Sequence, residues 1–125
     1  MEIRAAHFPG RAPLDAYGNG GFRFADMSHH GSLLCVPSGI YGWNLNSPAE
    51  FTIEAFERVF EETVDIEVLL VGTGAGLVPL LPELKEAFRA SGILADTMST
   101  GAAIRTYNVL LAEDRAVATA LLAVD

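Results

Sequence analysis

An apolar run in the middle of the chain ends in closely spaced glycines, and this junction limits the folds that the sequence can adopt. The run Asp65–Gly72 is rich in β-branched and aliphatic residues, and Gly74 and Gly76 continue the glycine spacing that Gly72 begins. A strand that is apolar on both faces is typical of a parallel sheet covered by helices on each side. The junction therefore predicts an α/β domain with this strand near its centre.

The segments after the glycines alternate between helix and strand. Prolines at 79 and 82 delay the next helix to Leu81 or Pro82, and Ser91–Gly92 ends it. A strand over 92–96, a helix over 102–113 capped by Ser99 or Thr100, and a strand over 116–124 follow, although the alanines of the last segment would also suit a helix. Residues expected to face the core from the two helices are Leu81, Leu84, Phe88, Ile104, Tyr107 and Leu111. Right-handed crossovers between these strands predict a central mixed, mostly parallel sheet in a three-layer single domain.

The first third of the chain reads as β structure. An extended piece over 13–17 and a turn over 18–21 lead into a strand over 21–26, in which Phe22 and Phe24 alternate with polar positions. We expect 27–31 to be a turn to a second strand over 31–37, so that the two strands form an N-terminal β-hairpin. Residues 40–45 are a further short strand or loop.

Acidic side chains crowd the segment between this β region and the central strand. The pattern over 47–62 predicts an amphipathic helix with Ile53, Phe56 and Phe60 inward, and Glu54 can pair with Arg58 one turn later. The acidic segment (50–67) contains Glu50, Glu54, Glu57, Glu61, Glu62, Asp65 and Glu67. It is either a solvated face or a docking surface for a basic partner.

Composition excludes several classes of function. The 125 residues suit one domain over 1–125, and a formal net charge of −8 disfavours nucleic-acid binding, which requires cationic side chains. No apolar run reaches the ~20 residues that cross a bilayer, and the N-terminus lacks a signal-peptide pattern, so we expect no transmembrane segment and a cytoplasmic location. The single cysteine, Cys35, is expected to be buried as a small hydrophobe.

The glycine turn has two interpretations, a phosphate cradle or a tight corner. Gly72 and Gly74 fit the first two positions of the G-x-G-x-x-G dinucleotide fingerprint, but Leu77 occupies the third. The delayed helix also keeps its N-terminal amides away from a phosphate at Gly74. Asp96, which we expect at the end of a strand, lies roughly 20 residues downstream, where a ribose-binding carboxylate would also lie. The sequence favours the corner, and no P-loop pattern is present.

A polar cluster at the start of the 102–113 helix borders the same edge of the sheet. We expect a small crevice there, with five candidate ligand-binding residues: Thr73, Gly74, Ser99, Thr100 and Arg105. An arginine beside hydroxyls and backbone amides can hold an anion, or Arg105 can simply pair with a surface acid. Because no general base or nucleophile accompanies it, binding is easier to argue than catalysis.

Histidines do not suggest a metal site. His29 and His30 are adjacent on an expected turn, and Asp26 is the only neighbouring candidate ligand. Two adjacent side chains do not converge on one ion without further ligands. We therefore expect no metal and no cofactor.

Several short motifs, taken together from roughly Ala12 to Ala123, resemble one known family. They are Tyr17-x-x-x-Gly21-Phe22, GSLLCVP, Trp43, VLLVGTG, Met98-Ser99-Thr100, Ala103-x-Arg105-Thr106-Tyr107-Asn108-x-Leu110 and Glu113-x-Arg115-x-Val117. The chain resembles the Mth-type domain family, which includes the mitochondrial respiratory complex I assembly factor 3 proteins, an adipogenesis-associated cytoplasmic relative and small bacterial proteins of unknown function. The resemblance implies a three-layer α/β domain with a mixed sheet and a strand as its last segment. It transfers no catalytic residue.

The resemblance also implies a function through protein partners. The family's mitochondrial members are similar to chaperone-like assembly factors, so the expectation is a non-enzymatic protein-binding module that assists assembly of a respiratory or membrane complex. The acidic segment and exposed aromatic residues near Tyr41 and Trp43 would be its contact surfaces. The alternative is a small-molecule or anion-binding protein, or an enzyme, that uses the crevice at the glycine turn. Edge strands in the opening hairpin leave monomer and homodimer open.

Overall fold

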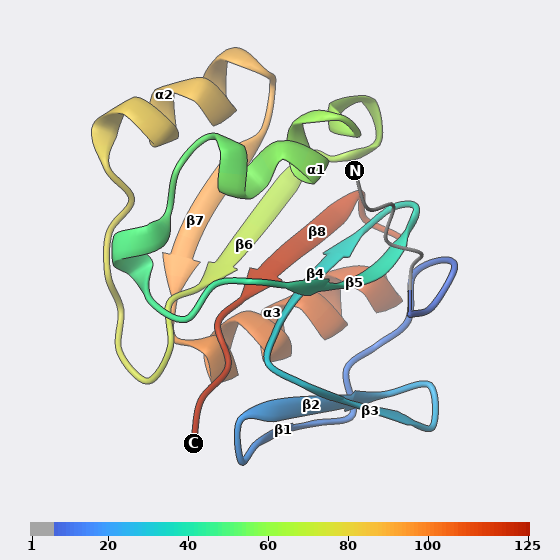
Figure 1. The fold of residues 1–125 in the computed structure, drawn as a ribbon. Helices are drawn as coiled ribbons and strands as arrows, with labels where there is room; N and C mark the ends of the chain where they lie inside the picture. Colours follow the sequence, from blue (N-terminus) through green and yellow to red (C-terminus); the bar gives the residue numbers. More distant parts are fainter. Residues whose placement is uncertain (1–6) are drawn as a thin grey trace, which may run out of the picture.

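The computed structural model describes residues 7–125, which form an α/β fold on two β-sheets (Figure 1). One sheet has the strand order β5-β4-β8-β6-β7 and the other has the order β1-β2-β3. The strands are β1 (Ala16–Gly18), β2 (Gly21–Phe24), β3 (Met27–His30), β4 (Ser32–Val36), β5 (Gly39–Trp43), β6 (Val68–Gly72), β7 (Leu94–Met98) and β8 (Val117–Leu121). The helices are α1 (Glu57–Phe60), α2 (Pro82–Ala90) and α3 (Thr100–Ala112), with short 3-10 turns η1 (Pro48–Glu50), η2 (Glu54–Phe56) and η3 (Thr63–Asp65).

The large sheet is mixed. β6 runs parallel to both β7 and β8, whereas β4 runs antiparallel to both β5 and β8. The expected parallel arrangement thus holds for the strands that follow the acidic segment, and the β4–β5 hairpin adds an antiparallel part. The segment after α3 is strand β8, which lies between β4 and β6 at the middle of the sheet.

Alternating side chains of the large sheet pack into two separate cores, one on each face of the sheet. The sheet and the elements that cover its two faces therefore form three layers. Leu34 and Leu69 face α1 and α2, while Leu33 and Leu70 face α3 and the small sheet. Figure 1 shows α1 and α2 on one face of the sheet and α3 on the other. This period-2 alternation on a sheet covered on both faces is the reason that β4, β6 and β8 are apolar at nearly every position. The three-layer α/β fold predicted from the sequence is confirmed.

The N-terminal strands pair differently from the expected hairpin. β2 pairs with β1 and with β3, so β1 and β2 form the hairpin, and β4 pairs with β5 and β8 instead. The prediction that 27–31 is a turn is therefore wrong, since Met27–His30 is strand β3. A two-residue turn at Ala25 and Asp26 makes this connection, with φ angles of 47° and 61°. Such turns are usually marked by Asn-Gly or Asp-Gly, which this stretch lacks.

The expected helix over 47–62 is divided into short turns. Phe51 and Phe56 both pack on Trp43, with ring centroids 5.6 Å and 5.2 Å from the indole. Five residues apart on one straight helix, these two rings would point in well separated directions, so the chain breaks between them. Phe56 faces the core and Phe60 packs against it, as predicted, but Ile53 is 43% exposed. The predicted Glu54–Arg58 pair is also replaced, because the Arg58 guanidinium lies 3.7 Å from the centroid of the Tyr41 ring.

The later helices largely follow their sequence signals. α2 begins at Pro82, α3 is capped by the Ser99 hydroxyl, which accepts a hydrogen bond from the Ala102 amide, and Ile104 and Tyr107 are buried. Leu84 and Phe88 face the core, but Leu81 precedes the helix and is 68% exposed, so its prediction as a core residue is wrong. Cys35 is buried as expected, and this burial raises the pKa of its thiol.

Candidate functional site

The glycine turn lies at the carboxyl end of β6, directly beside the start of α3. A Cβ added at Gly72 would lie 2.9 Å from the Thr100 Cα and 2.9 Å from Leu121 Cδ2. Only a residue without a side chain allows α3 to approach the strand so closely. The interpretation of this turn as a tight corner therefore has a physical basis in the contact between Gly72 and Thr100.

One backbone–backbone hydrogen bond and one bond to a side chain fasten the turn to α3. The Thr100 amide donates to the Gly74 carbonyl (2.8 Å), and the Gly74 amide donates to the Thr100 hydroxyl (3.0 Å). That hydroxyl in turn donates to the Leu122 carbonyl (2.7 Å). Gly74 has a φ of 100°, a backbone conformation that glycine adopts without strain. Thr100 thus links three segments and is fully buried.

Thr73 plays the same kind of structural role inside the loop that follows β6. Its side chain is buried, and its hydroxyl shares its single proton between the Gly76 carbonyl and the more distant Met98 carbonyl and accepts from the Val78 amide (3.1 Å). These bonds use the donor and acceptor capacity of the hydroxyl. Thr73 and Thr100 therefore shape the walls of the site from behind and do not line the open space.

A crevice of about 670 Å³ opens beside this corner, and we call it the GTG crevice. It brings together three of the five expected residues, Gly74, Ser99 and Arg105. Its other lining residues are Tyr17, Asn46, Ala75, Gly101, Ala123, Val124 and Asp125. Ser99 is the N-cap of α3, and Arg105 is exposed on the same helix. The crevice thus offers the Arg105 guanidinium, the Tyr17 phenol and the Asn46 side-chain amide, together with the Asp125 carboxylate.

Tyr17 was not among the candidate residues derived from the sequence. It comes from β1 in the small sheet, and its hydroxyl lies against Gly101 in the first turn of α3. The signal that could have identified it is its place in the family motif that begins at Tyr17. No local pattern indicates that a strand of the opening region reaches α3.

The remaining polar residues of the RTYN motif serve the fold. The Asn108 side chain accepts a bond from the Leu14 amide (2.9 Å) and donates one to the Leu14 carbonyl (2.8 Å), which fixes the segment leading into β1. Tyr107 is buried, and the Thr106 hydroxyl donates to the Ala102 carbonyl within α3. Arg105 is therefore the member of this motif that faces solvent.

The geometry disfavours a dinucleotide at this turn. α2 begins at Pro82, and the loop 73–81 separates its amides from Gly74. Asp96 does not end its strand as expected, because β7 continues to Met98 and Asp96 pairs with Leu70 inside the ladder. The acid therefore lies short of the strand end at which a ribose-binding carboxylate acts.

His29 and His30 lie on strand β3 and not on a turn. The His29 ring packs against the His7 ring with centroids 4.8 Å apart, and its Nε2 lies 3.1 Å from the Ser32 carbonyl oxygen. Burial lowers the pKa of His29, and the nearby His7 and His30 act in the same direction. Within residues 7–125, no three His, Cys, Asp or Glu side chains are grouped to hold a metal ion.

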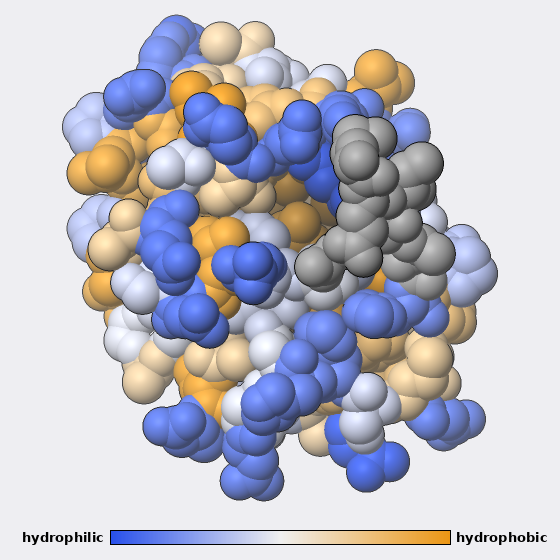
Figure 2. Space-filling model, in the orientation of Figure 1, coloured by the Kyte–Doolittle hydropathy of each residue, from blue (hydrophilic) through white to orange (hydrophobic). Residues whose placement is uncertain are grey.

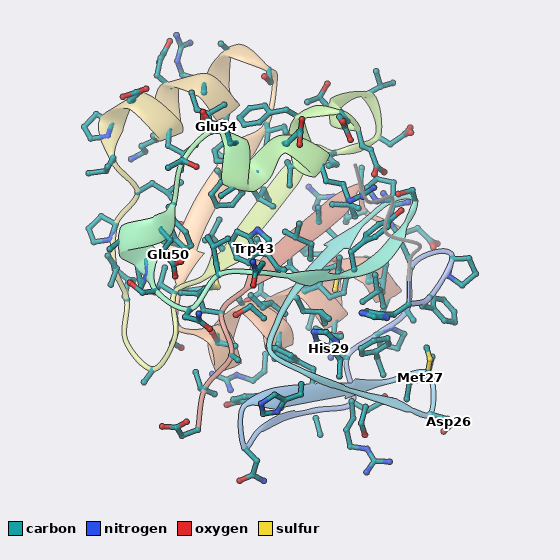
Figure 3. All side chains as sticks on the ribbon, in the orientation of Figure 1. Asp26, Met27, His29, Trp43, Glu50 and Glu54 are labelled. Atoms are coloured by element: carbon teal, nitrogen blue, oxygen red, sulfur yellow. The ribbon has the colours of Figure 1, made fainter. Side chains whose placement is uncertain are left out.

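The contact surface expected from the aromatic residues is not available. Tyr41 and Trp43 are both buried, and the indole NH of Trp43 donates to the Ala55 carbonyl (2.8 Å). Figure 3 shows Trp43 inside the curve of the segment that carries Glu50 and Glu54. The acidic residues, in contrast, are mostly exposed, although Glu62 binds the amide and hydroxyl of Ser38 and Glu50 binds the Ser47 amide.

Comparison with known proteins places relatives across nearly the whole chain. The model of a family described as a protein of unknown function (DUF498/DUF598) matches residues 14–122. An uncharacterized protein of Rhodobacter capsulatus is 39% identical over 98% of this chain and 93% of its own length. The mouse protein named NADH dehydrogenase (ubiquinone) 1 alpha subcomplex assembly factor 3 is 30% identical over 98% of this chain, which spans 66% of the mouse protein.

Solved structures with the same fold are also similar to this chain in sequence. A crystal structure described as an outer membrane protein of Bartonella henselae is 63% identical, with a TM-score of 0.92 over 95% of this chain and 100% of that chain. The solution structure of a Mth938-like domain from Bordetella pertussis is 28% identical, with a TM-score of 0.79 over 98% of this chain and 92% of that one. Among the helices of residues 7–125, none has the length and apolar character needed to cross a membrane.

Proposed function

This chain belongs to the DUF498/DUF598 family of proteins of unknown function, and we propose from that premise that it is a non-enzymatic protein-binding module. Its role is to assist the assembly of a respiratory or membrane complex through protein contacts. The observation that carries this proposal is the likeness to relatives named as NADH dehydrogenase assembly factors, which extends over 86–98% of this chain in mouse and zebrafish. A likeness of that extent concerns the domain itself and not an isolated motif.

The use of the polar residues supports binding over chemistry. The side chains of Thr73, Thr100 and Asn108 make internal hydrogen bonds, so these polar residues of the family motifs maintain the fold. Among residues 7–125 no buried side-chain nitrogen or oxygen lacks a hydrogen-bond partner. The acidic segment instead presents an exposed charged surface, as a module that recognises basic partners requires.

Charge reversal in the acidic segment tests the proposal. Glu54→Lys, Glu57→Lys and Glu61→Lys, combined in one variant, should reduce capture of partner proteins from a lysate of the source organism, measured by pull-down and mass spectrometry. Arg105→Ala serves as the control on the other side of the sheet and should capture the same partners as the wild type. Equal capture by the charge-reversed variant and the wild type would contradict this function.

The GTG crevice supports a second candidate, a small-molecule or anion-binding protein. Arg105, Ser99 and the Tyr17 hydroxyl line a volume of about 670 Å³, which is large enough for a nucleotide-sized or smaller ligand. A thermal-shift screen with nucleotides, inorganic phosphate and carboxylates tests it. A stabilising ligand whose effect disappears in Arg105→Ala would favour the crevice, and a screen without any shift would leave protein binding as the function.

A further inference from the structure

A groove beside α2 gathers apolar side chains that the helical pattern of the sequence assigns to the core. The groove has a volume of about 290 Å³ and is lined by Phe51, Thr52, Ile53, Glu54, Leu81, Glu83 and Leu84. Ile53 and Leu81 belong to different segments and are 43% and 68% exposed. We call this feature the Ile53–Leu81 groove. Its floor is continuous with the core through Phe51 and Leu84, which are buried.

The loop that leads to α2 extends this apolar surface. Residues 77–81 read Leu-Val-Pro-Leu-Leu, and Leu77 is 64% exposed. Val78 and Leu81 are exposed as well, whereas Leu80 packs against the core, and a group of exposed aliphatic side chains of this kind marks an interaction site. Figure 2 shows hydrophobic surface interleaved with hydrophilic residues on the face that carries α1 and α2.

The loop is organised before any partner arrives. The Thr73 hydroxyl ties the Gly76 carbonyl and the Val78 amide together, and prolines at 79 and 82 restrict the backbone between them and α2. Binding to such a surface loses little conformational entropy. This order distinguishes the surface from a loop that is merely exposed.

The negative charge around the groove favours a cationic binding partner. Glu54 and Glu83 stand in the lining itself, and Glu50 and Glu57 are exposed on the same acidic segment as Glu54. The cations nearest in sequence are Lys85 and Arg58, and the Arg58 guanidinium lies over the Tyr41 ring. Figure 3 shows Glu50 and Glu54 along the segment that runs beside α2. A second copy of this chain, with a formal net charge of −8, and an anionic lipid surface would both be repelled. A cationic segment with apolar side chains is complementary in both respects.

We propose that the Ile53–Leu81 groove docks a basic, amphipathic segment of a partner protein, which places aliphatic side chains between Ile53 and Leu81 and cationic side chains against Glu54 and Glu83. This inference rests on the proposed function and names the chemistry of the partner. Recognition follows the helix-in-groove mode, in which apolar anchors supply affinity and flanking charges supply orientation.

A synthetic peptide of leucine and lysine with helical spacing is the probe. Titrated into isotopically labelled protein, it should shift the amide resonances of residues 51–54 and 77–84, and added salt should weaken binding because the charges are exposed. Leu81→Ser and Ile53→Ser should each weaken binding about tenfold, as expected for an aliphatic anchor that is lost. Val109→Ser is the matched control, since Val109 is an exposed aliphatic residue on α3.

Three results would contradict the proposal that this groove docks a basic amphipathic segment. They are no shifts at these amides at about 1 mM peptide, equal affinity of the Leu81→Ser variant, and equal binding of a peptide with glutamate in place of lysine. Concentration-dependent shifts of the same amides without peptide would assign the surface to self-association instead.

A second arm separates this inference from the proposed function. The Ile53→Ser/Leu81→Ser double variant is expressed in a strain that lacks the chromosomal gene, and the assembly of respiratory complexes is followed on native gels. An assembly defect in the deletion strain that the double variant fails to rescue supports both proposals. If the double variant rescues fully, the function stands and the groove fails, whereas normal assembly in the deletion strain contradicts the function itself.

Discussion

Gly72 shows how one absent side chain fixes the geometry of the GTG crevice. An alanine there would place its Cβ 2.9 Å from the backbone of Thr100, which cannot swing aside as a side-chain tip could. We expect Gly72→Ala to lower the free energy of unfolding by about 1–3 kcal/mol, the usual cost of overpacking a tight core. Urea denaturation followed by circular dichroism measures it.

The matched control for this change lies in the same loop. Gly76 has open space around its Cα, and Gly76→Ala should leave the free energy of unfolding unchanged or raise it by up to about 1 kcal/mol through reduced freedom of the unfolded chain. Equal stability losses for both alanines would show that the loop, and not the contact with Thr100, is sensitive.

His29 makes stability depend on pH. Burial lowers its pKa below the ordinary 6.5, and the hydrogen bond to the Ser32 carbonyl only partly opposes this effect. The unfolded chain therefore binds more protons than the folded chain below pH 6.5. The stability contributed by neutral His29 is therefore fully present above pH 6.5, and it is lost as the pH falls through the pKa of His29 in the folded chain.

The histidine effect can be measured by comparing variants at two pH values. Wild-type stability should fall between about pH 7 and pH 5.5, and His29→Asn should show a smaller fall, since asparagine does not titrate. Ser28→Ala, at an exposed position of the same strand that does not titrate, should retain the wild-type slope. An unchanged slope in His29→Asn would assign the acid sensitivity to other groups.

At the scale of elements, the segment 47–65 holds its short turns through aromatic packing and not through helix propensity. The Phe56 ring contacts Trp43, Phe51 and Phe88 and is fully buried. Phe56→Ala should cost about 3–5 kcal/mol of stability. Thermal unfolding followed by tryptophan fluorescence reports it, and the exposed Ile53→Ala should change stability far less; comparable losses at both sites would contradict this account.

Sequence patterns predicted best the elements whose local signals agree with their tertiary surroundings. The buried run before the glycines, the prolines before α2 and the Ser99 cap of α3 each have one structural outcome. The prediction of one helix over 47–62 was wrong because Phe51 and Phe56 both pack on the Trp43 ring. Two residues five positions apart cannot both face one ring from a regular helix. Strand β3 was not predicted because the turn before it uses Ala25 and Asp26 in a backbone conformation that is usually marked by glycine.

The structure brings three of the five predicted site residues to one crevice and turns the other two inward. Gly74, Ser99 and Arg105 line the crevice, because carboxyl ends of parallel strands meet at one edge of a sheet. Thr73 and Thr100 turned inward, since a threonine next to free backbone groups satisfies them first. Tyr17 was missed because its approach to α3 depends on how the small sheet packs, so that only its place at the start of the family motif could have indicated it.

At the scale of the whole molecule, β8 joins the two halves of the large sheet. It pairs with β4 through Leu33 and Leu121 and with β6 through Leu70 and Thr119, and both cores use its side chains. A chain that stops at Ala116 should therefore lack cooperative unfolding, measured by circular dichroism and by amide exchange. A sharp transition in that truncated chain would mean that β4 and β5 are stable without β8.

The position of β8 also sets when the protein can become native in the cell. A ribosome releases the chain from its N-terminus, yet β4 has no neighbour on one side until residues 117–121 have emerged. Apolar strand edges therefore stay open until β8 has emerged, which is the condition under which nascent chains recruit holding chaperones. A module that we propose to assist other assemblies would itself depend on being sheltered until β8 has been synthesised.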